Sequence, residues 1–373
     1  MTLEFFTNTT SASFGSSSFG HHFIVGLSGI TLSDIDKKML STLRPAGILL
    51  LKRNFDHAAS SYDIWLNKLK ILIEDVKQYS EREKIIVSLD HEGQRVMRTP
   101  APLTVFPNAQ KFCTRAAEVA AAHARELRTL GVNLSWAPVA DVHSNPANPI
   151  IGERAFGNTP ESVSKYAVEY LAALEKGGVL GCAKHFPGHG DTSSDSHIEL
   201  PVVNISEDEL WNRELPPFVA LIKAGVSFIM TAHILYPQID PLASATMSHK
   251  ILNGILRKRM NFEGVIVSDD LDMHAVAKMF SDSGTATVEA FNAGCDMFIA
   301  ARNDLEHFDR SLLAANFMAQ GLKSGAITEA RLFDAFTRIN KVFEQRLENP
   351  IAQPLSPAVL AEHKILADDI RAS

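Results

Sequence analysis

One polar loop of the sequence brings together several groups that can transfer protons. Residues 184–197 read KHFPGHGDTSSDSH and contain three histidines, two aspartates, two glycines and a proline. The apolar run Val179–Ala183 comes directly before the loop and predicts a buried strand. Because loops carried by rigid strands often hold catalytic groups, we expect chemistry here rather than an ordinary solvated turn.

Glycoside hydrolysis is the chemistry that these residue types favour. The reaction needs one carboxylate at the anomeric carbon and one acid/base group at the leaving oxygen. Asp269 follows another apolar run and fits the first role. His197 fits the second role, because the pKa of an imidazole, about 6.5 in peptides, lies near neutral pH. Asp195, two residues before His197, could hold this imidazole in one orientation.

Each of these residues also has a plainer structural interpretation. Asp269 could cap the helix that follows it, although Asp270 or Asp272 could serve as the cap instead. His197 alone would be an ordinary loop histidine. Its position beside Asp195 and the presence of Asp269 favour the catalytic interpretation.

Metal-assisted hydrolysis is a rival reaction class, since His- and Asp-rich loops at strand ends can bind divalent metals. The possible ligands in the loop are His185, His189, Asp191, Asp195 and His197. The sequence lacks a helical His-Glu-x-x-His pair, so we predict neither a metal nor a cofactor. A carbohydrate-binding barrel without activity is also disfavoured, because binding alone does not require an Asp-x-His motif beside a strand-end carboxylate.

The elements that must position these residues are eight short apolar runs that alternate with helical patterns. The runs are residues 23–27, 46–51, 85–89, 132–137, 179–183, 226–232, 264–268 and 295–300. Continuous hydrophobicity is typical of parallel strands covered on both faces. Eight strand–helix units in about 300 residues predict a (β/α)₈ TIM barrel. A doubly wound open sheet is the alternative, but the first run is not followed by a Gly-rich phosphate-binding motif.

Polar residues follow most of the predicted strands. They are Asp90, Glu92, Asp141, Lys184, His185, His233, Asp269 and Asp270. In a TIM barrel the carboxyl ends of the strands meet at one face, where the catalytic residues lie. We therefore expect these side chains to converge on a single pocket.

Composition limits the class of protein and its partners. The 373 residues carry a formal net charge of −7, so we expect no nucleic-acid or membrane partner. Three widely spaced cysteines predict a reducing, cytoplasmic location. We expect a flexible N-terminal tail at residues 1–22, one catalytic barrel at residues 23–345 and a C-terminal arm at residues 346–373. A monomer or weak dimer is expected.

Four motifs in order resemble glycoside hydrolase family 3, and within it the bacterial β-N-acetylglucosaminidases of the one-domain type. They are DHEGQRV at 90–96 with Arg98 after it, GERAFG at 152–157, the loop at 184–197 and SDDL at 268–271. The resemblance implies a retaining mechanism in which Asp269 is the nucleophile and His197, paired with Asp195, is the acid/base. It also implies that N-acetylglucosamine is held by Asp90, Arg98, Arg154, Lys184 and His185. The implied substrate is a muropeptide, N-acetylglucosamine linked β-1,4 to anhydro-N-acetylmuramic acid, in peptidoglycan recycling.

Some positions depart from the family pattern. Gln94 stands where a glycine is usual, and Asp272 and His274 stand where small or acidic residues are usual. These differences bear on the preference for the leaving sugar rather than on the chemistry. A histidine acid/base also leaves phosphorolysis open, because an imidazole does not repel an incoming phosphate as a carboxylate would.

Overall fold

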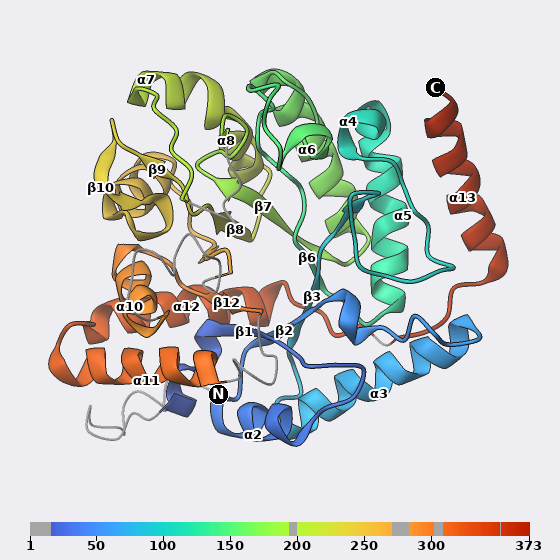
Figure 1. Ribbon diagram of the computed structural model, residues 1–373, viewed down its shortest axis with the longest axis horizontal. Coiled ribbons are helices and arrows are strands. Elements are labelled where there is room, and N and C mark those ends of the chain that lie inside the picture. Colours follow the sequence, from blue (N-terminus) through green and yellow to red (C-terminus); the bar gives the residue numbers. More distant parts are fainter. Residues whose placement is uncertain (1–15, 194–199, 271–282, 302–308, 351) are drawn as a thin grey trace.

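The computed structural model describes residues 16–193, 200–270, 283–301, 309–350 and 352–373. Its centre is an eight-stranded parallel sheet with the strand order β11-β8-β7-β6-β3-β2-β1-β12 (Figure 1). An isolated parallel bridge between Val267 of β11 and Met297, the residue before β12, connects the two edges of the sheet into a barrel. The strands are β1 (Phe23–Gly26), β2 (Gly47–Leu50), β3 (Ile86–Leu89), β6 (Leu134–Ser135), β7 (Leu180–Phe186), β8 (Phe228–Thr231), β11 (Val265–Val267) and β12 (Phe298–Ala300). The predicted (β/α)₈ barrel is confirmed.

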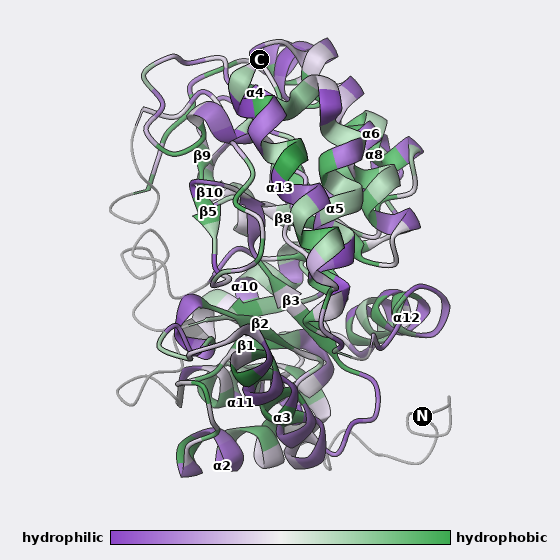
Figure 2. Ribbon diagram, turned by 90° about the vertical axis from the view of Figure 1, so that its right-hand side faces the viewer, coloured by the Kyte–Doolittle hydropathy of each residue, from purple (hydrophilic) through white to green (hydrophobic). Residues whose placement is uncertain are grey.

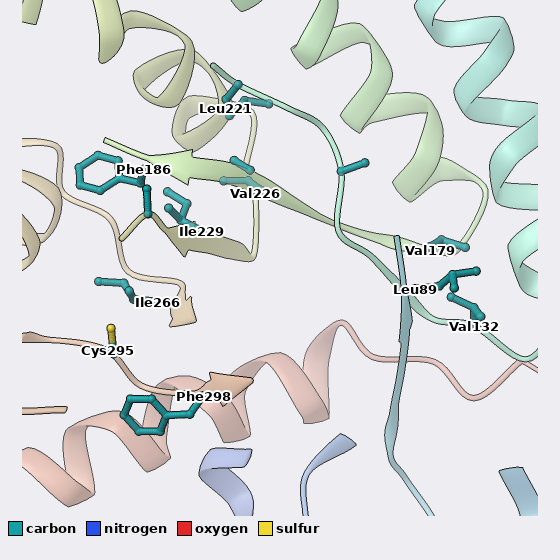
Figure 3. Packing of buried hydrophobic residues seen from close by; sticks show 14 of the residues in the cluster. Leu89, Val132, Val179, Phe186, Leu221, Val226, Ile229, Ile266, Cys295 and Phe298 are labelled. Carbon is teal, nitrogen blue, oxygen red and sulfur yellow. The ribbon is translucent and has the colours of Figure 1, made fainter. Parts of the chain in front are cut away.

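The strands are mostly apolar because their alternate side chains enter two different cores. Ile24, Ile86 and Cys182 belong to the cluster inside the barrel, whereas Val25 and Val87 belong to the larger cluster between the sheet and its helices. Figure 3 shows part of that outer cluster, with strand residues such as Ile229 and Ile266 in it. In Figure 2 the strands β1, β2 and β3 are accordingly hydrophobic along their length.

Helices cover the outside of the barrel. They are α2 (Asp34–Leu43), α3 (Tyr62–Ser80), α5 (Ala116–Thr129), α6 (Pro160–Lys176), α8 (Pro216–Lys223), η8 (Lys250–Arg259), α10 (Ser283–Ala293), α11 (Asp309–Ser324) and α12 (Glu329–Gln345). Side chains cap the N-termini of several of these helices: Ser33 caps α2, Ser61 caps α3 and Thr159 caps α6. None of the helices within the described ranges is long and apolar enough to cross a membrane.

Both chain ends contain more structure than the sequence indicated. Ser16–His22 forms a short helix, η2, in which Phe19 and His22 are buried, so the flexible tail cannot include these residues. The Ser- and Gly-rich composition concealed one large apolar side chain that packs into the core. At the other end, α13 (Pro357–Ala372) lies along the side of the barrel formed by α5 and the short helix α4 (Ala109–Phe112) (Figure 1), where His363 is buried against Glu126.

Two small hairpins extend from strands at the carboxyl end of the barrel. β4 (His91–Gly93) pairs with β5 (Val96–Met97) after β3, and β9 (Leu235–Tyr236) pairs with β10 (Asp240–Ser244) after β8. The sequence did not predict either hairpin, because both are too short for a clear alternating pattern. They enlarge the loop layer that surrounds the candidate site.

Candidate active site

A cavity of about 280 Å³ opens at the carboxyl ends of the strands. Its wall combines apolar side chains, including Trp136 and Met230, with a polar set contributed by several strands. The polar residues are Asp90, Arg98, Arg154, Lys184, His185, His189, Asp269 and Asp270. Every sugar-binding residue that the sequence predicted therefore lines the same cavity as Asp269.

The fifth strand is longer than the sequence predicted. β7 continues through Lys184 and His185 to Phe186, whereas the prediction ended it at Ala183 because charged residues followed. Lys184 and His185 are buried nonetheless, since carboxylates from the segments after β3 and β6 pair with them. Their side chains consequently project from rigid backbone rather than from a loop.

Lys184 is the centre of a buried ionic cluster. Its Nζ lies 2.9 Å from Asp90 Oδ1 and 2.6 Å from Glu92 Oε1. Arg154 donates two hydrogen bonds to Glu92, of 2.8 and 2.9 Å, and Arg98 lies 3.7 Å from Asp90. A bidentate pair of this kind fixes orientation as well as charge.

Charge pairing favours the ionised forms of Glu92 and Lys184 although both residues are buried. Burial alone would raise the pKa of Glu92, but Arg154 and Lys184 outweigh it and hold the pKa well below its usual range. Burial would lower the pKa of Lys184, and here Asp90 and Glu92 outweigh it and raise the pKa. Glu92 does not line the cavity, so its role is to orient Arg154 and Lys184.

Asp141, in the segment that follows β6, holds the start of the predicted catalytic loop. Its Oδ2 lies 2.7 Å from His185 Nδ1, and its Oδ1 accepts the backbone N–H groups of His185 and His189 at 3.1 and 2.7 Å. Burial opposes ionisation of Asp141, but His185 outweighs it and lowers the pKa. An ionised Asp141 makes Nδ1 the donor of His185, which leaves Nε2 to act toward a ligand.

Asp269 follows β11, and its carboxylate faces the cavity. Its Oδ1 accepts the backbone N–H of Asp270 at 2.8 Å. Burial would raise the pKa of Asp269, but its interactions with His185 and His233, the hydrogen bond from the Asp270 N–H and the nearby Lys184 outweigh burial and lower the pKa. An ionised carboxylate on a rigid strand end is a competent nucleophile. His233, also predicted at a strand end, lies behind it, with Nε2 3.2 Å from the Asp270 carbonyl oxygen.

The predicted acid/base pair falls in a segment that the structure does not describe. Asp195 and His197 lie outside the described residues, as do Asp272 and His274. The loop is described up to Ser193, and Asn148 anchors this part. Its side chain donates to the His189 carbonyl oxygen at 2.8 Å and to Thr192 Oγ1 at 3.1 Å.

Sequence reasoning missed the residues that support the site from a distance. Asn148 had no signal, because an asparagine in a loop is ordinary, whereas Trp136 directly precedes the polar end of the fourth strand and could have been noted. Within the described ranges, no three His, Cys, Asp or Glu side chains are grouped so that they could hold a metal. The imidazoles of His185 and His189 have Asp141 and Thr192 as partners at Nδ1.

Comparison with known families identifies this arrangement. The profile of the Glycosyl hydrolase family 3 N terminal domain matches residues 24–342. The chain belongs to glycosyl hydrolase family 3. This confirms both the family and the enzyme class, a glycoside hydrolase, that the sequence motifs predicted. The matched range includes the carboxylates, histidines and basic residues that face one cavity at the carboxyl ends of the strands.

Curated family 3 relatives share about a third of their residues with the chain. A Beta-hexosaminidase from Methylococcus capsulatus is 38% identical over 281 residues, covering 73% of this chain and 80% of its own. Beta-hexosaminidase A from Pseudoalteromonas piscicida is 34% identical over 332 residues. That match covers 82% of this chain but only 54% of the relative, so the chain spans about half the length of that protein.

Solved family 3 structures share the fold over nearly the whole chain. A β-N-acetylglucosaminidase from Paenibacillus sp. str. FPU-7 has a TM-score of 0.86 at 31% identity and covers 95% of this chain and 68% of its own. NagZ from Neisseria gonorrhoeae, in complex with N-trifluoroacetyl-D-glucosamine, has a TM-score of 0.71 at 28% identity. That match covers 94% of this chain and 96% of NagZ.

Proposed function

We propose that the protein is a retaining β-N-acetylglucosaminidase that removes terminal N-acetylglucosamine from β-1,4-linked muropeptide fragments. The observation that carries the proposal is the ionised Asp269 carboxylate, which faces a cavity where Lys184, His185 and Arg154 are already oriented by buried carboxylates. The printed names of the relatives favour this sugar over other glycosides.

In the first step Asp269 attacks the anomeric carbon. A bond forms between a carboxylate oxygen and C1 while the bond from C1 to the leaving oxygen breaks, and His197 gives its proton to that oxygen. In the second step His197 removes a proton from water, which attacks C1 and releases Asp269. Asp195 orients His197 in both steps.

The ionic cluster supplies recognition of the sugar. Asp90, Arg98, Arg154, Lys184 and His185 offer donors and acceptors that are fixed before substrate arrives. Such groups penalise a ligand that leaves them unpaired, so they discriminate strongly between sugars with different hydroxyl patterns. We place the reaction in peptidoglycan recycling in the cytoplasm, with the protein as a monomer or weak dimer. The low cysteine content supports the location.

The test is release of p-nitrophenol from the β-N-acetylglucosaminide by the wild type and by Asp269→Ala. We expect wild-type activity that survives EDTA, and a loss of about 10³-fold or more in Asp269→Ala, because the covalent route disappears. Asp269→Asn is the variant matched to Asp269→Ala, because it removes the charge of the carboxylate but keeps the shape of the side chain.

Other outcomes would redirect the proposal. Stimulation by phosphate, with a sugar 1-phosphate as product, would identify a phosphorylase. Activity that EDTA removes and a divalent metal restores would favour metal-assisted hydrolysis. Absence of wild-type activity on this glycoside and on the β-1,4-linked disaccharide would refute the assigned substrate class.

A further inference from the structure

Two adjacent residues outside the cavity contact the predicted catalytic loop from its outer side. Arg213 and Glu214 end the helical segment η6 (Leu210–Glu214), which continues into α8. The Arg213 guanidinium lies 2.7 Å from Glu214 Oε1 through Nε and 2.6 Å from Asp191 Oδ2 through Nη2. One arginine thus reaches the loop by a charged hydrogen bond to Asp191, while its second bond, to the adjacent Glu214, holds the guanidinium on its own helix.

Glu214 also contacts the loop backbone directly. Its side chain is 1% exposed, and Oε2 has no hydrogen-bond partner among the described residues. Gly188 has a φ of +139°, and a Cβ at that position would lie 2.6 Å from Glu214 Oε2. The turn therefore packs against the carboxyl group without space for a side chain. On the β9 side, the Tyr236 hydroxyl donates to the Gly188 carbonyl oxygen at 2.5 Å.

The charges around Glu214 make the contact unusual for a buried carboxyl. Arg213 is the neighbouring cation on its own helix, while Asp141 and Asp191 face it as anions from the strand end and the loop, and Tyr236 faces it from β9. Burial raises the pKa of Glu214 to about 7, although Arg213 opposes this. A purely structural contact at this position would be served better by an apolar side chain, because burying a carboxyl costs free energy.

We propose that Arg213 and Glu214 are a positioning pair for the proton-transfer step. Together they fix Gly188 and Asp191, and Asp191 is four residues before Asp195 in the chain. The predicted sugar-binding residues are held by the cluster around Lys184 and by Asp141, and Asp141 also accepts the His189 N–H between Gly188 and Asp191. The inference rests on the proposed function, because it assigns the acid/base role to the loop that carries His197.

The decisive measurement is the dependence of kcat/KM on the leaving group. The substrates are the 2,4-dinitrophenyl β-N-acetylglucosaminide, which leaves without protonation, and the β-1,4-linked disaccharide of N-acetylglucosamine, which needs the acid. Arg213→Met removes both charged hydrogen bonds. We expect kcat/KM for the disaccharide to fall about 10- to 100-fold, while kcat/KM for the dinitrophenyl glycoside changes less than about 3-fold.

Three variants make the result specific. Arg213→Lys should recover part of the loss, because an ammonium reaches one of the two carboxylates but cannot bridge both. Asp191→Asn weakens only the ion pair between Arg213 and the loop. It should lower kcat/KM for the disaccharide selectively, but less than Arg213→Met does. Arg346→Met is the matched control, since Arg346 is 39% exposed against 32% for Arg213 and forms a comparable 2.7 Å ion pair with Glu175, away from the loop. Arg346→Met should leave kcat/KM for both substrates unchanged.

The outcomes separate this inference from the proposed function. Equal losses of kcat/KM for the two substrates in Arg213→Met would show a general structural role and overturn the inference, as would unchanged kinetics. If Arg213→Met does not fold, Asp191→Asn decides in the same way. Failure of the wild type on both substrates would refute the proposed function itself. An active wild type in which His197→Ala selectively loses the disaccharide, but Arg213→Met does not, would refute only the positioning pair.

Discussion

The barrel contains a buried ionic cluster at each end of its strands. At the carboxyl end, Lys184 and Arg154 pair with Asp90 and Glu92 beside the cavity. At the amino end, Asp296 precedes β12 and accepts hydrogen bonds from Arg257, from Arg331 at 3.2 Å and from the Ile266 backbone N–H at 3.0 Å. The residue types are the same, but their surroundings differ.

The two clusters differ in whether their charged side chains face the cavity. Around Asp296 the arginines are also bonded to main-chain carbonyl groups, for example Arg331 to Cys295 and Arg257 to Gly264, and none of them lines the cavity. At the carboxyl end Lys184 pairs with Asp90, and Arg154 pairs with Glu92. Asp90, Arg154 and Lys184 nevertheless line the cavity. The amino-end cluster therefore ties α12 and η8 to the sheet, whereas the carboxyl-end cluster holds donors and acceptors ready for a ligand. This division between stability and function is the one expected of a TIM barrel.

The largest effect should come from breaking the amino-end cluster. Asp296→Asn removes the charge that compensates Arg257 and Arg331, and we expect the free energy of unfolding to fall by about 3–5 kcal/mol. Urea unfolding at fixed pH measures this change. The kcat/KM of the remaining folded enzyme should stay within about 2-fold of the wild type. A large loss of kcat/KM in folded Asp296→Asn would contradict the division of roles.

The converse substitution is Lys184→Met in the carboxyl-end cluster. It removes a cation that pairs with Asp90 and Glu92, so we expect kcat/KM to fall about 100-fold. Asp90 and Glu92 keep Arg98 and Arg154 as partners, so the free energy of unfolding should fall less than in Asp296→Asn. Steady-state kinetics on the p-nitrophenyl glycoside and urea unfolding, measured on the same preparations, test both statements. If Lys184→Met instead lowered the free energy of unfolding as much as Asp296→Asn does and left kcat/KM nearly unchanged, Lys184 would be a structural residue.

The sequence predicted the eight strands and part of the cavity because these have local signals. Each strand coincides with a mostly apolar run, and polar residues such as Asp90, Lys184 and Asp269 follow the runs directly. Arg98 and Arg154 have no such signal and were implied only by the resemblance to family 3. The extension of β7 through Lys184 and His185 was missed, since these residues pair with three carboxylates that come from distant parts of the sequence, Asp90, Glu92 and Asp141. Charged residues end a strand in a sequence pattern unless their partners are known.

The supporting contacts have no local signal for the same reason. Arg331 lies 35 residues from Asp296, and Arg213 lies 22 residues from Asp191. In the sequence each of these arginines is an ordinary helix residue, and only the barrel brings it to its carboxylate. Ser16–His22 is a similar case, because the burial of Phe19 depends on packing against α11 and α2 rather than on its own segment.

Glu214 sharpens the comparison because it lies at the functional end of the barrel but, like Asp296, does not line the cavity. Its pKa is raised from 4.5 to about 7 in the folded protein, mainly by burial. The folded state therefore favours the protonated form. The resulting stabilisation is fully present below pH 4.5 and is lost as the pH rises through about 7.

Glu214→Gln cannot titrate, so it should remove this dependence. Between pH 4.5 and pH 8, the stability of the wild type relative to Glu214→Gln should decline by at most about 3 kcal/mol, with most of the decline below about pH 7. Thermal or urea unfolding of both proteins at several pH values measures the difference. Glu263→Gln, a surface substitution, reports any effect of removing a carboxylate alone. A constant difference between wild type and Glu214→Gln across this window would mean that Glu214 is ionised throughout, with Arg213 as its full counter-charge, like the carboxylates of the two ionic clusters.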